Sequence, residues 1–209
     1  MIAVFHWFVK ITGWIPQRLM FHTRIFYEDK RVQSRRIRGK AIVVSNHHAI
    51  MDYGVMMFVF WNRTLRCAVA DVVYQRNFIM PLLLKCLGCV SVERENYDFS
   101  FLGKLKRVLD RGGVAEIYPE SRLPKPGEQI PLEFKPSYVH LALEADAPIL
   151  PVYHSGKRQG KKGQCVVIGK PILVSDLHDP NLSEKENIEK INEYVRSKII
   201  ELGQTCEGR

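Results

Sequence analysis

Short, continuous apolar segments alternate with longer stretches of helical periodicity from residue 41 onward, and this pattern limits the possible folds more than any other feature. The apolar segments lack the polar–apolar alternation of a strand with one face in water. Strands of this kind are expected to be covered on both faces. The expected strands are 41–44, 65–70, 89–92, 114–118, 149–153 and 165–168.

The stretches between these strands have the length and spacing of helices. The last one is amphipathic, with Ile188, Ile191, Val195 and Ile199 at helical intervals. The expected helices are 52–61, 77–87, 99–111, 134–145 and 183–202. Since 209 residues suffice for one sizeable core, we predict an α/β fold: a single domain with a largely buried mixed sheet flanked by helices.

Two amphipathic helices are expected before this domain, broken at residues 13–16, with the second continuing through Arg24 to Glu28. The segment is rich in aromatic residues, but Lys10 and Arg18 interrupt it too early for a helix that spans a bilayer. It also lacks the basic start and cleavage site of a signal peptide. We therefore expect residues 1–29 to be helices of the membrane interface, followed by a folded domain over 30–209.

The charge balance favours anionic partners. The chain has 31 Lys and Arg against 22 Asp and Glu, a formal net charge of +9. Nucleic acid and acidic lipid head groups both suit such a field. The basic clusters at 30–40 and 157–162 contain no aromatic residues on which bases would stack. We therefore expect anionic membrane lipids as partners and no nucleic acid.

Five cysteines are spread along the chain, and only Cys86 and Cys89 form a CxxC pair. A structural zinc site would need two further ligands at similar spacing, and no second pair follows. We expect Cys86 and Cys89 to be ordinary buried thiols, and we expect no metal and a reducing compartment.

A histidine and a carboxylate stand together in Ser45–Tyr53, directly after the first buried strand. Such a pair can remove a proton from a hydroxyl, because the carboxylate orients the ring and stabilises the imidazolium. His47 and Asp52 are five residues apart and can meet only if His47 lies on the turn before the helix. His48 and Asp52 are four apart and can meet within a helix. The spacing leaves both histidines open.

Three further blocks lie near strand ends: Gly88–Arg94, Tyr118–Arg122 and Ala147–Val152. Ligands of α/β proteins gather at the carboxyl edge of the sheet, so these blocks are expected to converge near the turn that holds His47.

Together with Asn46–Asp52, these blocks resemble the glycerolipid acyltransferase family, which includes bacterial lysophosphatidate acyltransferases. They occur in the family's order, at 46–52, 88–94, 118–122 and 147–152, and the resemblance covers residues 40–175. It implies an acyltransferase catalytic domain over 30–209. The implied reaction moves a fatty acyl group from acyl-CoA or acyl carrier protein to the sn-2 hydroxyl of 1-acyl-glycerol 3-phosphate, making phosphatidate.

The resemblance also implies roles for individual residues. His47 becomes the base and Asp52 its partner, which decides against His48. The acceptor phosphate is implied to be bound or surrounded by Arg94, Glu120, Ser121 and Arg122. The acyl or acceptor channel is implied to be lined by Asn46, Gly88 and Pro151. A further candidate for binding is Lys135. No cofactor or metal is implied, since the acyl carrier is a co-substrate.

Two positions depart from the family pattern. Ser121 stands where the family usually has glycine, and Ala49 where many members have serine. These changes leave other acceptors open, namely glycerol 3-phosphate, another lysophospholipid or an ornithine-type lipid. A non-catalytic membrane-surface binding module is a lower-ranked alternative.

The expected mechanism is direct transfer in a ternary complex, without an enzyme nucleophile. Backbone amides near the start of the helix that follows His47 are expected to stabilise the oxyanion. We expect a peripheral or monotopic protein on the cytoplasmic face of the membrane of a bacterium.

Overall fold

A seven-stranded sheet organises the computed structural model, which describes residues 1–75, 78–92, 100–156 and 163–207. The strand order is β1-β7-β6-β2-β5-β3-β4. All neighbouring strands run parallel except β6 and β7, so the prediction of a mixed sheet is confirmed. The strands are β1 (Arg24–Tyr27), β2 (Ala41–Ser45), β3 (Leu65–Ala70), β4 (Val90–Val92), β5 (Val114–Ile117), β6 (Ile149–His154) and β7 (Cys165–Ile168).

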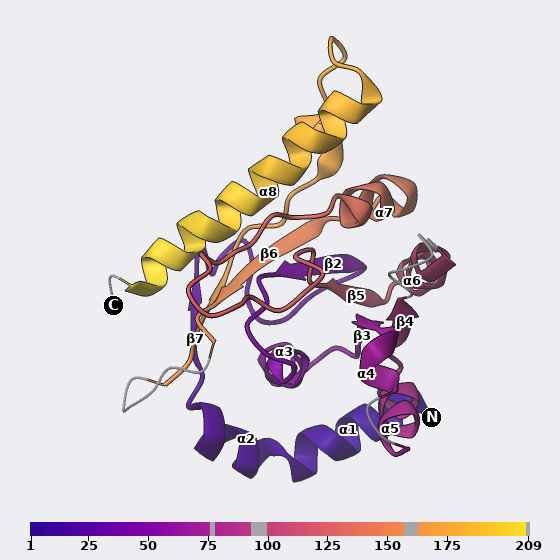
Figure 1. Ribbon diagram of the computed structural model, residues 1–209, viewed down its shortest axis with the longest axis vertical. Coiled ribbons are helices and arrows are strands. Elements are labelled where there is room, and N and C mark those ends of the chain that lie inside the picture. The colour runs from indigo at the N-terminus through magenta and orange to yellow at the C-terminus, as the bar shows by residue number, and fades with distance from the viewer. Residues whose placement is uncertain (76–77, 93–99, 157–162, 208–209) are drawn as a thin grey trace.

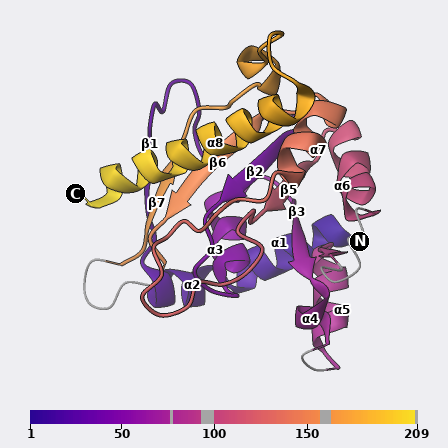
Figure 2. The ribbon, with the colours of Figure 1, turned by 45° about the horizontal axis from the view of Figure 1, so that its top comes forward.

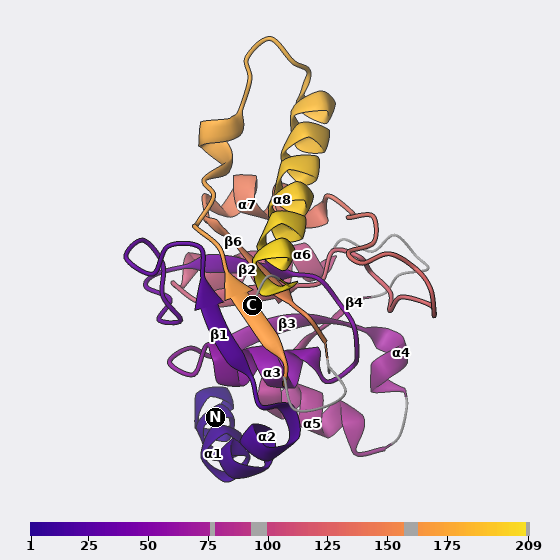
Figure 3. The same cartoon turned by 90° about the vertical axis from the view of Figure 1, so that its left-hand side faces the viewer.

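Helices cover both faces of this sheet, as Figure 1 shows. On one face lie α6 (Ser100–Asp110), α7 (Ser137–Ala145) and the long α8 (Glu184–Glu207), which crosses β6 and β7 in Figure 2. On the other face lies α3 (Asp52–Val59), with α1 (Ile2–Thr12) and α2 (Trp14–Phe21) beyond it (Figure 3). The remaining described helices are α4 (Asp71–Tyr74), α5 (Met80–Leu87) and the 3₁₀ turn η1 (Val174–Leu177).

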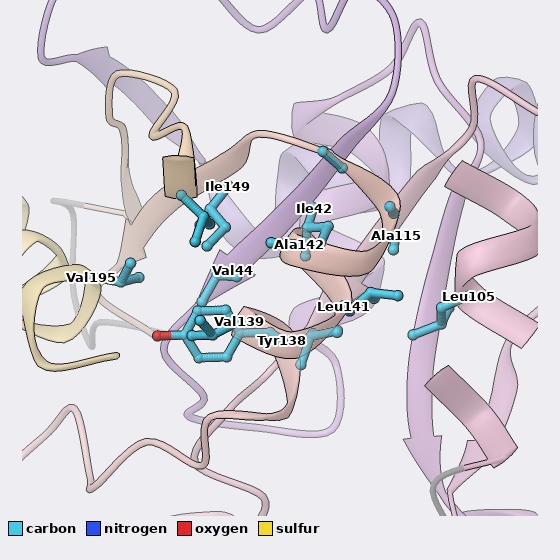
Figure 4. Packing of buried hydrophobic residues seen from close by; sticks show 14 of the residues in the cluster. Ile42, Val44, Leu105, Ala115, Tyr138, Val139, Leu141, Ala142, Ile149 and Val195 are labelled. Atoms are coloured by element: carbon cyan, nitrogen blue, oxygen red, sulfur yellow. The ribbon is translucent and has the colours of Figure 1, made fainter. Parts of the chain in front are cut away.

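The continuous apolar character of β2 follows from its central position. All five of its residues are buried. Ile42 and Val44 pack into the cluster formed with α7 and α8, which Figure 4 shows around Tyr138. Val43 points to the opposite face and joins the cluster formed with α3. Because full burial of one such side chain contributes about 1.5–3 kcal/mol, both faces of the strand favour apolar residues.

Buried polar side chains attach α1 to the rest of the molecule. Lys10 Nζ donates to the carbonyl oxygens of Arg63 at 2.6 Å and Trp61 at 3.0 Å, just beyond α3. His6, only 1% exposed, bonds through Nε2 to the carbonyl oxygen of Leu87 at 2.8 Å. These contacts hold α1 beside α3 and α5.

The prediction of a helix through residue 28 is wrong. The helix α2 ends at Phe21, and the next residue, His22, adopts the left-handed conformation with φ 45°. Residues 24–27 then form β1, which pairs in parallel with β7 at the edge of the sheet. Ile25 and its aromatic neighbours suit a strand, and they find their partner about 140 residues later in the chain. The division of the chain at residue 29 stays a prediction.

A disulfide joins Cys165 of β7 to Cys206 of α8, with their Cα atoms 6.3 Å apart. Cys86 and Cys89, which we expected to be ordinary buried thiols, are free but only half-buried, and Cys67 is free and buried. The pairing could not be predicted from the sequence, because 41 residues separate Cys165 from Cys206 and they become neighbours only when α8 packs on β7. The cysteines therefore no longer favour a reducing compartment.

Candidate active site

His47 lies on the turn between β2 and α3, at the carboxyl edge of the sheet. Asp52 is the first residue of α3. The Nδ1 atom of His47 is 2.8 Å from Asp52 Oδ2, and the imidazole is 17% exposed whereas the carboxylate is 4% exposed. The ring is thus held on its inner side and open to a ligand through Nε2. Pairing with Asp52 required His47 to lie on the turn before the helix, and the structure confirms that it does.

The same carboxylate oxygen closes the turn. Asp52 Oδ2 accepts hydrogen bonds from the backbone N–H groups of His48 at 2.7 Å and Ala49 at 2.8 Å. Burial alone would raise the pKa of Asp52. The hydrogen bond from His47, the nearby His154 and these two amides outweigh burial and lower that pKa below its ordinary value. The carboxylate is therefore ionised at neutral pH and ready to stabilise a protonated ring.

Three backbone amides of the turn already have acceptors in the structure. The amides of His48 and Ala49 donate to Asp52, and the amide of His47 donates to Glu120 Oε1 at 2.9 Å. The stabilisation of an oxyanion by amides near the start of α3 stays a prediction.

A second imidazole lies against the carboxylate. His154, at the end of β6 and fully buried, places Nε2 at 3.5 Å from Asp52 Oδ2 and 2.7 Å from the carbonyl oxygen of Asn46. Its Nδ1 accepts from Gly156 N and Gln164 Nε2, both at 3.3 Å. Nδ1 is thus an acceptor and Nε2 carries the proton. Burial lowers the pKa of His154 to about 4, so the ring is neutral.

The third block supports the other side of His47. The Tyr118 ring stacks on the His47 ring, with centroids 4.4 Å apart. Its hydroxyl donates to Glu116 Oε1 at 2.6 Å. Burial raises the pKa of Glu116 to about 8, so this carboxyl is protonated at neutral pH. Glu120 is only 4% exposed, and burial raises its pKa. Its carboxylate accepts hydrogen bonds from the backbone of His47 and of Leu132.

An apolar cavity of about 270 Å³ opens beside His47. It lies between the start of α3, β3 and α5, and its wall is mostly apolar. Residues that line it include Met57, Ala68, Leu84, Leu87, Tyr118 and Ser121. A hydrocarbon chain entering this cavity would have its polar end near the His47 ring.

The residues expected around a phosphate lie in different settings. Arg94 is outside the described residues. Arg122 is half exposed and makes two hydrogen bonds to Glu128, at 2.7 and 2.9 Å. Ser121 has φ 60°, a left-handed conformation that glycine adopts most easily. This explains why the family usually has glycine there. Lys135 is exposed, and its backbone N–H donates to Pro119.

The residues expected to line a channel do not line the cavity beside His47. Asn46 is fully buried and bonds His154, through Oδ1 to its N–H and through Nδ2 to its carbonyl oxygen, both at 2.9 Å. Gly88 caps α5 with φ 71°, against the Arg66 guanidinium. Pro151 lies within β6, paired with Val44 of β2. In the described part of the chain, Asn46 supports the turn and the other two shape elements behind it.

Sequence reasoning missed three groups of this site. Glu116 is a carboxyl within a buried strand, and Tyr118 was treated only as the start of a block. The sequence analysis gave His154 no part in the site, although it ends an apolar strand at the same edge as His47. A buried polar residue in an apolar strand is the signal that could have identified Glu116 and His154, since such groups need a specific partner.

Comparisons with known proteins identify the family of this chain. The acyltransferase family model matches residues 24–155. The 1-acyl-sn-glycerol-3-phosphate acyltransferase of Limnanthes douglasii is 26% identical over 167 residues, covering 78% of this chain and 58% of that protein. The 1-acyl-sn-glycerol-3-phosphate acyltransferase beta of Homo sapiens is 24% identical over 148 residues, covering 70% and 52%. The chain thus spans little more than half the length of these curated relatives.

One solved structure has a similar fold. The crystal structure of the 1-acyl-sn-glycerophosphate (LPA) acyltransferase PlsC from Thermotoga maritima matches with a TM-score of 0.63 and 17% sequence identity. The match covers 97% of this chain and 79% of that one. At this identity the likeness concerns the fold.

Proposed function

Because the chain belongs to the acyltransferase family, we propose that it moves a fatty acyl group from acyl-CoA or acyl carrier protein to the sn-2 hydroxyl of 1-acyl-glycerol 3-phosphate. The product would be phosphatidate, in phospholipid biosynthesis. One observation carries this proposal: the His47–Asp52 pair, with Nδ1 and Oδ2 2.8 Å apart, stands beside an apolar cavity. A base next to a hydrocarbon-sized space suits transfer of an acyl chain to a hydroxyl.

In the proposed reaction the ionised Asp52 holds a proton on His47 Nδ1, which leaves Nε2 free to accept one. Nε2 takes the proton of the acceptor hydroxyl as its oxygen attacks the thioester carbonyl. A carbon–oxygen bond forms, and the carbon–sulfur bond breaks in the collapse of the tetrahedral intermediate. The proton on Nε2 then passes to the departing thiolate, so the enzyme returns to its starting state.

We assign the acyl chain to the apolar cavity. Its walls come from α3, β3 and α5, and few polar atoms line it. Removing a chain from water into such a space is favourable by about 0.8 kcal/mol for each buried methylene. The reactive carbonyl would then lie near the open side of His47.

The acceptor phosphate is assigned to the arginines of the second and third blocks, Arg94 and Arg122. A guanidinium matches two phosphate oxygens at once. Since Arg122 is paired with Glu128, a phosphate would have to replace that carboxylate. Ser121 in place of glycine adds a hydroxyl beside the same cavity, and this observation keeps glycerol 3-phosphate, another lysophospholipid or an ornithine-type lipid as alternative acceptors.

We further propose that α1 and α2 lie in the membrane interface, on the cytoplasmic face of a bacterial membrane. Large apolar side chains are exposed on both helices, namely Val4, Trp7, Phe8, Ile11, Trp14, Ile15, Leu19 and Met20. Such a surface suits a helix that lies in the head-group region. In the described ranges no helix is both long and apolar enough to cross a bilayer.

The test is acyl transfer to 1-acyl-glycerol 3-phosphate in lipid vesicles, with acyl-CoA and acyl carrier protein as separate donors. We expect His47→Ala to lose on the order of 10²–10⁴ in rate. The matched control is His140→Ala, an exposed histidine on α7, which should retain wild-type turnover. Full activity in His47→Ala would exclude the mechanism. Equal turnover of the other acceptors would exclude the assigned substrate.

A further inference from the structure

A second hollow, distinct from the cavity beside His47, lies at the opposite edge of the sheet. Its volume is about 620 Å³. Thr64 and Gly113, which line it, directly precede β3 and β5. These strands run parallel to β2, whose carboxyl end leads into His47. The hollow therefore faces the amino ends of the strands and lies apart from the acyl-transfer centre.

The charged residues that line this hollow are all basic: Arg66, Lys104, Arg107 and Arg111. We call it the cationic hollow. Within the described residues none of the four has a carboxylate oxygen within 4.0 Å, whereas Lys106 on the same helix pairs with Asp110 at 2.9 Å. On α6, Lys106 does not line the hollow and is neutralised by Asp110. Lys104 and Arg107 line the hollow and have no carboxylate partner among the described residues. Four like charges around one hollow produce a field that attracts an anion.

Arg66 gives the hollow a partly buried floor. Its Nε atom is buried and has no hydrogen-bond partner. The guanidinium lies against Gly88, where a Cβ atom would collide with Nη1. Glycine at this position therefore makes room for the arginine. Because Arg66 lines the hollow, the positive charge of its guanidinium favours an anion there.

The other walls favour an anion with an apolar part. Ile2 and Ala3 of α1 and Val108 of α6 line the hollow beside the cations. The same α1 carries exposed apolar side chains along its length, including Val4 and Phe8. A guanidinium cluster matches phosphate, and apolar walls next to an exposed amphipathic helix suit a lipid better than a soluble ion. We propose that the cationic hollow binds the phosphate of an anionic phospholipid at the membrane surface.

This site can be tested without turnover, so its failure is separate from failure of the proposed reaction. The probe is phosphatidylcholine vesicles with or without one-fifth phosphatidylglycerol, a lipid that the proposed reaction neither uses nor makes. The test variant is Arg107→Gln/Arg111→Gln. The matched control is Arg38→Gln/Lys170→Gln, which removes two exposed cations elsewhere and changes the net charge equally. Binding is measured by co-sedimentation at fixed ionic strength.

We expect the test variant to lose about tenfold or more of its phosphatidylglycerol-dependent binding, because each cation near an acidic surface contributes about 1 kcal/mol. The control should lose much less, and both should transfer acyl groups to a short-chain, water-soluble acceptor at the wild-type rate. An equal loss in the two variants, or no loss in either, would overturn the site. Should the double variant fold poorly, Lys104→Gln repeats the test at a third exposed position.

A second arm distinguishes a lipid head group from free phosphate. Inorganic phosphate is added to the vesicles, with chloride at matched ionic strength as the reference. Because the proposed site recognises a phosphate group, we expect phosphate to release the wild-type protein more than chloride does, and this difference to be absent in Arg107→Gln/Arg111→Gln. Binding of inorganic phosphate that is lost in this variant, while both double variants keep equal phosphatidylglycerol-dependent binding, would assign the hollow to a soluble phosphate and exclude the lipid.

Discussion

Replacing Asp52 by asparagine separates the charge of this carboxylate from its shape. The oxygen Oδ2 accepts from His47 Nδ1 and from the amides of His48 and Ala49, all within 2.7–2.8 Å. The asparagine side chain has one oxygen, and the amides of His48 and Ala49 require an acceptor at the position of Oδ2. We therefore expect the oxygen to keep its place, so that His47 retains its proton on Nδ1 and its free Nε2.

What the variant loses is the attraction between the carboxylate and the imidazolium that forms during the reaction. The two charge centres would lie about 4 Å apart, where an effective dielectric constant of about 20 gives about 4 kcal/mol. Since about 1.4 kcal/mol corresponds to a factor of ten in rate, Asp52→Asn should lower kcat about 10³-fold. Acceptor saturation should change little, because Asp52 is only 3% exposed and does not line the cavity.

The assay follows thiol release from acyl-CoA in vesicles that contain 1-acyl-glycerol 3-phosphate, with kcat and KM measured separately. Urea denaturation checks that the variant is folded. A kcat within threefold of the wild type would refute the reasoning, because His47 would then act without a charged partner. A large rise in acceptor KM with unchanged kcat would instead place Asp52 in substrate binding.

Three further predictions follow from buried groups and from the cavity. Burial raises the pKa of Glu116 to about 8, against 4.5 for a free carboxyl, so the stability of the wild type should fall as the pH rises between these values. In urea denaturation at pH 8, Glu116→Gln should therefore be more stable than the wild type by about 4 kcal/mol. Burial lowers the pKa of His154 to about 4, against 6.5 for a free imidazole, so this histidine is protonated in the unfolded chain before it is protonated in the folded one. The free energy of unfolding should fall by about 3 kcal/mol between pH 6.5 and 4. This part of the pH dependence should vanish in His154→Gln. Gly54 lines the cavity, and the nearest atom to a Cβ there is 3.9 Å away, so Gly54→Leu should shift donor preference to shorter chains in competition assays, whereas Gly103→Leu on α6 should not.

Local pattern was enough to predict the central part of the fold. The segment 41–44 is apolar at every position, which only a strand buried on both faces requires, and β2 has that environment. The five-residue spacing of His47 and Asp52 required a turn between strand and helix, and the structure has one. In both cases the deciding pattern lies within a few neighbouring residues, so the local sequence carries the information.

Contacts between distant segments could not be predicted in this way. The strand β1 has four residues of mixed character and pairs with β7, far along the chain. The support of Asp52 by His154 depends on β6 lying next to β2, a neighbour relation that periodicity does not encode. The cysteine pair has the same origin. These features follow from strand order, which is set by how the whole sheet assembles.

Strand order also explains why separate blocks act on one imidazole. In the sheet, β2 lies between β5 and β6. The turn after β2 therefore receives contacts from both neighbours: Tyr118 and Glu120 follow β5 and hold the ring and backbone of His47, while His154 ends β6 and lies against Asp52. Because the three strands run parallel, their carboxyl ends meet at one edge. A substitution of His154, which does not line the cavity, should thus act on the dyad through geometry, without touching substrate.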